Sequence, residues 1–221
     1  MVGRLAAFVA NPANSYAAHT VQYVTLCAAA GALAVFVGTA LGIAVGRRPT
    51  FAFVAVNVTG LMRAIPVIAF LAFAIPYLGL GFTPSLVALT VLGIPPILLN
   101  TYTGIRGIDA ATIDAAQGCG MTRWQIVRRI QIPLVLPVIA AGARTSVVQI
   151  VATATLAAII GAGGYGDYIL SGLYQVDTTQ ILAGAVPVTL LAMLAEIGLG
   201  RVQYVLTPEG LRTVAGGETR S

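Results

Sequence analysis

The most informative part of the sequence is residues 105–133, IRGIDAATIDAAQGCGMTRWQIVRRIQIP, a polar segment within an otherwise apolar chain. Asp109 is a favourable helix N-cap, so its position predicts a helix over residues 110–117. Gly118 and Gly120 follow and provide the backbone freedom with which many helices end. The first half of the segment therefore predicts a short polar helix and a glycine turn.

The second half of the segment predicts another helix. Thr122 and Gln125 form a capping-box pattern at its start, and Pro133 is expected to end it because proline lacks a backbone N–H. One face is apolar: Ile126, Val127 and Ile130. The exposed side is basic: Arg123, Arg128 and Arg129. From periodicity alone, this helix could lie among lipid headgroups or press its apolar face onto a partner.

The remainder of the chain has the composition of a membrane protein. Of its 221 residues, 58% are apolar and 9% are charged, whereas about a quarter are charged in an average soluble domain. Long tracts lack any charge, and each can supply the roughly 20 residues that cross a bilayer. We predict an all-α polytopic membrane protein with residues 1–221 as one domain. Its five predicted spans lie near residues 20–45, 56–79, 84–104, 134–157 and 180–203.

The basic residues indicate an orientation. All 12 are arginines, and most gather in three segments: Arg47 and Arg48, Arg106 to Arg129, and Arg201, Arg212 and Arg220. If these segments are cytoplasmic, five spans place the N-terminus outside and the C-terminus inside the cell. Aromatic residues do not alternate with the arginines as a stacking platform for bases requires, so nucleic acid is not an expected partner.

The polar segment resembles a known signature. Asp114, Ala115, Ala116, Gly120, Ile130 and Pro133 follow the spacing E-A-A-x3-G-x9-I-x-L-P, the EAA signature of ABC importer permeases, with Asp114 in place of Glu and Ile132 in place of Leu. The resemblance implies a coupling helix that docks on a cytoplasmic ATPase subunit. It implies that Asp114 meets a basic group there, that Ala115 and Ala116 permit close approach, and that Gly120 permits the turn. Met121 and Arg123 belong to the same expected surface.

The wider resemblance covers residues 20–205 and is to small five-helix permeases with the MetI-like fold. Three stretches are most similar to osmoprotectant permeases: RAIPVIAFLAFAIPYLGLG at 63–81, NTYTGIRGID at 100–109 and ATATLAAIIGAGGYGDYILSGL at 152–173. This implies the permease subunit of an ABC importer in the bacterial plasma membrane, which moves glycine betaine, choline or carnitine inward by alternating access. Implied partners are a second permease, ATPase subunits that hold ATP and Mg, and an extracytoplasmic binding protein. The chain itself is then no enzyme and binds no cofactor.

Other functions stay open. Within the same class, the alternative is a permease for methionine or another amino acid. A different class is an ATPase-independent secondary transporter or channel, which predicts inverted repeats and a buried ion-pairing carboxylate near mid-membrane. Neither feature is evident in the sequence.

Further candidate residues lie outside the signature. Gly163, Gly164, Tyr165 and Asp167 form either a gate or binding-protein contact or a flexible external loop. Arg63, Arg144 and Gln149 are candidate pathway residues, although Arg63 could snorkel to the headgroups and Arg144 is expected to face the bundle interior. His19 has no partners at metal-ligand spacing, and no P-loop or catalytic triad is evident. We therefore predict neither a metal site nor a catalytic site.

Overall fold

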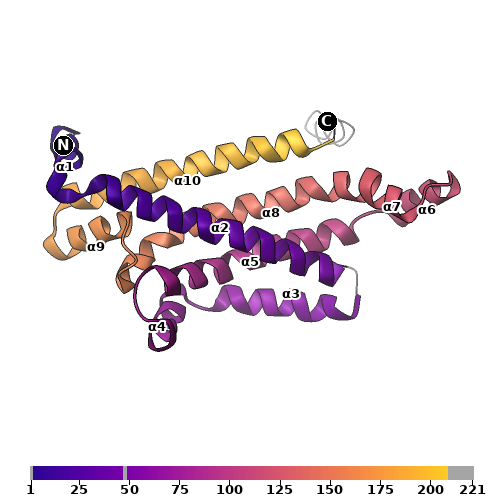
Figure 1. The fold of residues 1–221 in the computed structure, drawn as a ribbon, viewed down its shortest axis with the longest axis horizontal. Coiled ribbons are helices and arrows are strands. Elements are labelled where there is room, and N and C mark those ends of the chain that lie inside the picture. The colour runs from indigo at the N-terminus through magenta and orange to yellow at the C-terminus, as the bar shows by residue number, and fades with distance from the viewer. Residues whose placement is uncertain (1, 47–48, 209–221) are drawn as a thin grey trace, which may run out of the picture.

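The computed structural model of the protein describes residues 2–46 and 49–208, and this part of the chain is helical without a β-strand. Four long helices lie side by side along the long axis of the molecule (Figure 1), with α2 against α5, α5 against α8, and α8 against α10. The elements in order are α1 (Val2–Ala10), η1 (Pro12–Asn14), α2 (Tyr16–Gly46), α3 (Pro49–Ala64), α4 (Val67–Leu78), α5 (Phe82–Arg106), α6 (Ala110–Gly118), α7 (Arg123–Ile126), η2 (Val127–Gln131), α8 (Ile132–Thr153), η3 (Ala154–Ile160), α9 (Tyr165–Gln175) and α10 (Thr178–Leu206).

The described residues contain four helical stretches long and apolar enough to cross a membrane: Pro12–Gly46, Phe82–Arg106, Arg123–Ile160 and Thr178–Leu206. A fifth span results if the bent pair formed by α3 and α4 is counted as one. The predicted all-α polytopic fold is thereby confirmed. Four of the arginines used to predict the orientation, Arg47, Arg48, Arg212 and Arg220, lie outside the described residues.

The predicted span at 56–79 is broken in the middle. Residues Asn57–Ala64 of α3 and Val67–Leu78 of α4 meet at an angle of 88°. Pro66 caps α4 with an extended backbone, φ −63° and ψ 128°, and a proline disfavours helical geometry at the residue before it. Because neither half of this segment is long enough to cross a bilayer, the break makes it a bent span or a re-entrant turn.

Small residues bring the long helices into close contact. A Cβ added to Gly42 of α2 would lie 2.5 Å from Thr101 Cβ of α5, and one added to Gly38 would lie 2.9 Å from Ile97 Cβ. Between α8 and α5, the buried Ser146 hydroxyl donates a hydrogen bond to the Gly93 carbonyl at 2.8 Å. The small-residue face of α2 is therefore used within the chain, against α5, as GxxxG-like surfaces are in membranes.

The helix that begins after the glycine turn does not end at Pro133, contrary to the prediction. It widens at η2 into a π-helical turn, in which the Ile132 N–H donates to the Val127 carbonyl, and continues as α8 with Pro133 in its first turn. A π turn re-spaces the backbone hydrogen bonds, and Pro133 follows it directly, within the first turn of α8. As a result, α7, η2, α8 and η3 follow one another without a break from Arg123 to Ile160.

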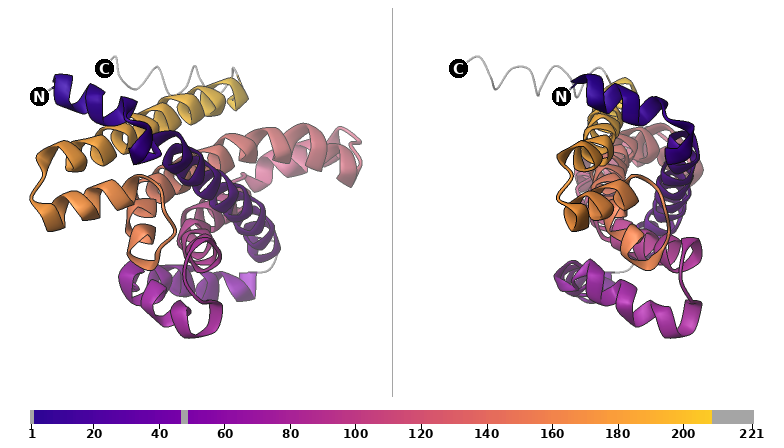
Figure 2. Two further views of the ribbon diagram at one scale, coloured as in Figure 1. Left: turned by 60° about the vertical axis from the view of Figure 1, so that its left-hand side comes forward. Right: turned by 90° about the vertical axis from the view of Figure 1, so that its left-hand side faces the viewer.

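The two ends of the bundle differ in content. Helices α6 and α7 project from one end, whereas α1 and α9 lie at the opposite end (Figure 1), and Figure 2 shows α1 crossing beside α10 there. The polar segment 105–133 and the glycine-rich stretch 161–166 are thus separated by the length of the long helices.

Candidate functional site

Helix α6 has the start and end that its sequence predicts. The Asp109 carboxylate accepts a hydrogen bond from the Ala111 N–H at 3.0 Å, which is the expected N-cap. At the other end, the Gly120 N–H donates to the Gln117 carbonyl at 2.9 Å and the Met121 N–H donates to the Ala116 carbonyl at 3.1 Å. These two bonds make a Schellman motif with Gly120 at its left-handed position.

Gly120 adopts φ +77°, a conformation that side chains other than Asn and Asp strongly disfavour. A Cβ added there would have no atom within 4 Å, so backbone geometry rather than space requires the glycine. Gly118, which was also expected to end the helix, is instead its last helical residue. Gly120 alone therefore makes the turn that redirects the chain into α7.

Helix α7 begins with the predicted capping box. The Thr122 N–H donates to Gln125 Oε1 at 2.8 Å, and the Gln125 N–H donates to Thr122 Oγ1 at 3.4 Å. Of the apolar face, Ile126 is buried while Val127 and Ile130 are half-buried. The basic side is exposed as predicted: Arg123, Arg128 and Arg129.

The tip of the segment presents a mixed surface. Asp114 and Ala115 are exposed on α6, whereas Ala116 is buried and Met121 and Pro133 are half-buried. Trp124 adds a large aromatic group to this surface, with 69% of the residue exposed. Trp124 is not among the residues predicted from the sequence, although a lone tryptophan beside Arg123 in a polar loop itself indicates a contact site.

The glycine-rich stretch at the opposite end is closely packed, which does not fit a flexible external loop. Gly163 and Gly164 have φ of +76° and +87°. A Cβ on Gly164 would lie 2.9 Å from Tyr23 Cδ2, and one on Gly166 would collide with the Thr155 carbonyl oxygen. The stretch therefore holds the start of α9 against α2 and η3.

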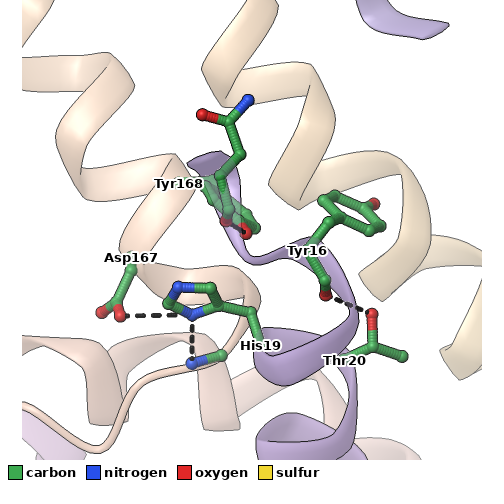
Figure 3. A network of polar contacts seen from close by, with 7 residues as sticks. Tyr16, His19, Thr20, Asp167 and Tyr168 are labelled. Carbon is green, nitrogen blue, oxygen red and sulfur yellow. Dashed lines mark hydrogen bonds and ion pairs between the residues drawn. The ribbon is translucent and has the colours of Figure 1, made fainter. Parts of the chain in front are cut away.

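His19 joins α2 to this stretch through one nitrogen atom. Its Nδ1 accepts a hydrogen bond from the Gly164 N–H at 3.2 Å and lies 3.5 Å from a carboxylate oxygen of Asp167 (Figure 3). An Nδ1 that accepts a hydrogen bond carries no proton. The hydrogen bond from Gly164 thus requires the neutral imidazole, whereas an ion pair with Asp167 requires the charged one.

Aromatic rings surround this contact. Tyr168 stacks on Tyr16 with centroids 5.5 Å apart, and its centroid lies 4.8 Å from that of His19. The Tyr168 hydroxyl donates to the Asn14 carbonyl at 2.6 Å, and burial raises the pKa of Tyr168 to about 12. The predicted Tyr165 is buried and donates to Thr20 Oγ1 at 2.9 Å. Gly163, Gly164, Tyr165 and Asp167 are therefore brought together at this end.

Arg144 does not face the bundle interior, contrary to the prediction. Its guanidinium forms a direct ion pair with Glu196 of α10 and a hydrogen bond of 3.5 Å to Gln203 Oε1. The side chains of Arg144 and Glu196 are 36% and 43% exposed. Their mutual contact on neighbouring helices satisfies both charges at the α8–α10 boundary instead.

The other two candidate pathway residues lie on α3 and α8. Arg63 is exposed in the last turn of α3, and Gln149 is half-buried on α8. Among the described residues, no group of three or more His, Cys, Asp or Glu side chains could hold a metal ion.

Several apolar spans, a bent pair and a capped polar segment at one end define a polytopic helical membrane protein of the transporter type. Residues 7–209 match the family described as the inner membrane component of binding-protein-dependent transport systems. The chain belongs to this family, and it is thus a multi-pass membrane permease component rather than an enzyme.

Three relatives illustrate the family. The carnitine transport permease protein OpuCB of Listeria monocytogenes is 42% identical over 90% of this chain and 92% of its own. The choline transport system permease protein OpuBB of Bacillus subtilis (strain 168) is 41% identical over 87% and 89%. The osmoprotectant import permease protein OsmW of Salmonella typhimurium is 36% identical over 93% and 98%.

A solved structure of the MetNI methionine ABC transporter in an inward-facing conformation has the same fold. One of its chains aligns with a TM-score of 0.76 over 90% of this chain and 100% of that chain, at 22% identity. This likeness confirms the MetI-like fold.

Proposed function

We propose that this chain is the permease subunit of an ABC importer for small quaternary ammonium osmoprotectants such as glycine betaine, choline and carnitine. The observation that carries the proposal is the similarity to permeases named for carnitine, choline and osmoprotectant transport, at 36–42% identity over most of both chains. Methionine is the alternative substrate, and it has only the likeness in fold in its favour.

The polar segment is the proposed contact with the ATPase subunits, which would hold ATP and Mg. Its capped helix, its Schellman turn and its exposed Asp114, Ala115 and Trp124 make a rigid projecting surface. A rigid element transmits motion between subunits better than a loop without internal hydrogen bonds. Met121, Arg123, Ile130 and Pro133 then support or flank that surface.

The opposite end, with α1 and α9, is the proposed extracytoplasmic end and would meet the substrate-binding protein. This places the N-terminus outside the cell and the C-terminus in the cytoplasm. A second permease would complete the pathway. It would cover apolar surface of α10, because only 17% of the most apolar 18-residue stretch of this helix is buried within the chain. Alternating access of the paired permeases would then be driven by ATP hydrolysis in the partner subunits.

The test is uptake of radiolabelled choline, glycine betaine and carnitine into proteoliposomes that contain the permease, its ATPase and its binding protein. We expect uptake that requires ATP hydrolysis. Methionine uptake without quaternary ammonium uptake would overturn the substrate assignment. Uptake that proceeds without ATP would overturn the importer class in favour of a secondary transporter or channel.

Substitutions at Gly120 test the coupling role in the same preparation. Gly120→Val forces a β-branched residue to φ +77°, so we expect uptake and substrate-stimulated ATPase activity to be lost. Gly120→Asn should keep most activity, because asparagine tolerates this conformation. Gly118→Ala is the matched control, as a Cβ there meets no atom within 4 Å and the residue is helical. Full activity of Gly120→Val would refute the coupling role.

A further inference from the structure

A cavity of about 510 Å³ opens beside α9 at the proposed outer end. This volume lies within the range of about 300–1,000 Å³ that small-molecule sites occupy. Aromatic side chains from three helices line it, namely Phe8 of α1, His19 of α2, and Tyr168 and Tyr174 of α9. Asp167 supplies a carboxylate to the same wall.

The charge of this cavity is negative when His19 is neutral. Asp167 is the only acidic residue among the described residues that line it, and no arginine does so. The Gly164 N–H donates to His19 Nδ1, and this bond requires the neutral imidazole. Asp167 lies in the first turn of α9, where the helix dipole favours a negative charge, while burial raises the pKa of its carboxyl. When His19 is neutral, no cation among the described residues pairs with this carboxylate.

A carboxylate beside aromatic rings is the chemistry that recognises quaternary ammonium cations. Such a cation offers no hydrogen-bond donor, so it is held by ring faces and by a nearby negative charge. Phe8 packs edge-on to Tyr168 with centroids 5.6 Å apart, and Tyr174 is 86% exposed at the cavity mouth. Ser171 and Gln180 add neutral polar groups for the remainder of the ligand.

We infer that this cavity is a binding site on the permease itself for monocationic quaternary ammonium compounds such as choline. The inference rests on the proposed function and adds a substrate contact to it. Asp167 attracts the ammonium group and repels a carboxylate, so zwitterionic glycine betaine binds more weakly than choline at this site. The permease thereby contributes selectivity beyond that of a binding protein.

The test is equilibrium binding of radiolabelled choline to the permease–ATPase complex in nanodiscs, without the binding protein. We expect saturable binding that excess choline displaces better than glycine betaine does. The uncharged carbon isostere 3,3-dimethyl-1-butanol should not displace it. Equal displacement by the isostere would overturn the site, because only apolar contact would then be involved.

Substitutions in the cavity lining test whether choline binds there. Asp167→Asn should weaken choline binding about tenfold, and Tyr174→Leu about threefold, whereas Tyr174→Phe keeps the ring and the affinity. Asp177→Asn is the matched control: it removes a carboxylate from the same end outside the cavity lining, and asparagine also serves as the N-cap of α10. Because Tyr174 is exposed, its substitution tests the site without disturbing the fold.

The outcomes separate this inference from the proposed function. If the complex with its binding protein transports choline but the permease–ATPase complex alone binds none, the site is refuted and the importer assignment stands. Unchanged affinity in Asp167→Asn and Tyr174→Leu likewise refutes the site. If no quaternary ammonium compound is transported at all, the proposed substrate class itself fails.

Discussion

Arg144 on α8 and Glu196 on α10 form a direct ion pair between two candidate membrane spans, and Gln203 accepts a further hydrogen bond from the same guanidinium. Gly200 lies beside the arginine, and a Cβ there would sit 3.5 Å from Arg144 Cζ. Charges at membrane depth are stable when they pair with each other. The pair therefore fixes the position of α10, which has few buried residues of its own, relative to α8.

Breaking this pair should destabilise the permease. We expect both Glu196→Gln and Arg144→Gln to lower the melting temperature in detergent, because each leaves one charge without its partner. The exchanged double variant, Arg144→Glu with Glu196→Arg, should recover much of the loss. Unfolding can be followed by reaction of the buried Cys27 with a thiol dye, once the exposed Cys119 is replaced by serine. Equal melting temperatures for all variants would show that the pair does not hold α10.

Among the closely packed glycines, Gly166 should tolerate a larger side chain least. In Gly166→Ala the new Cβ collides with the Thr155 carbonyl oxygen and crowds Ala158 Cβ at 2.7 Å. We expect a loss of about 1–3 kcal/mol of stability, as overpacking usually costs, seen as earlier reaction of Cys27 on heating. Gly198→Ala is the control, since a Cβ there meets nothing within 4 Å in a regular helix. A Gly166→Ala protein as stable as that control would contradict the packing at this end.

Local features of the polar segment could be predicted because their causes lie within a few residues. The Asp109 cap and the Thr122–Gln125 capping box each join residues two or three positions apart, and the structure has both. The spacing of the signature also identified the family. The continuation of the helix through Pro133 was missed, because a proline inside a helix usually breaks or kinks it and a π turn leaves no clear mark in the sequence.

Long-range pairs could not be predicted in the same way. Arg144 and Glu196 were both noticed in the sequence, but their pairing depends on how α8 lies against α10. His19 was recognised as an isolated histidine, whereas its contacts with Gly164 and Asp167 follow from the packing of α9 on α2. The bend at Pro66 likewise divides a tract whose composition alone fits one span. Tertiary packing, rather than local preference, decides each of these features.

Trp124 should contribute to the proposed ATPase contact. Exposed tryptophans that become buried at interfaces carry a large share of the binding energy. We expect Trp124→Ala to weaken association of the ATPase with the permease about tenfold, while Trp124→Phe keeps part of it. Association can be measured by titrating labelled ATPase onto the permease in nanodiscs. Unchanged association, together with reduced insertion into the bilayer, would instead make Trp124 a headgroup anchor.

The environment of Asp167 predicts two opposite pH dependences. Burial raises the pKa of Asp167, and the proximity of His19 only partly offsets this. The charged or titratable groups that face it in the described structure are His19 from α2 and Tyr168 from α9. Between its unfolded pKa and its raised folded pKa, the folded state holds more protons. The contribution of Asp167 to the free energy of unfolding is therefore fully present below the unfolded pKa of this carboxyl. It is lost as the pH rises through the folded pKa.

Choline binding should change in the other direction, because the cation needs the ionised carboxylate. We expect choline affinity to rise with pH through the raised pKa of Asp167, because the carboxylate that attracts the cation forms only above it. Asp167→Asn should remove both the pH dependence of binding and the stability change from this residue. Melting curves and choline titrations over the same pH series measure the two effects together. Binding and stability that change in parallel would show that Asp167 acts only through the fold and does not contact the cation.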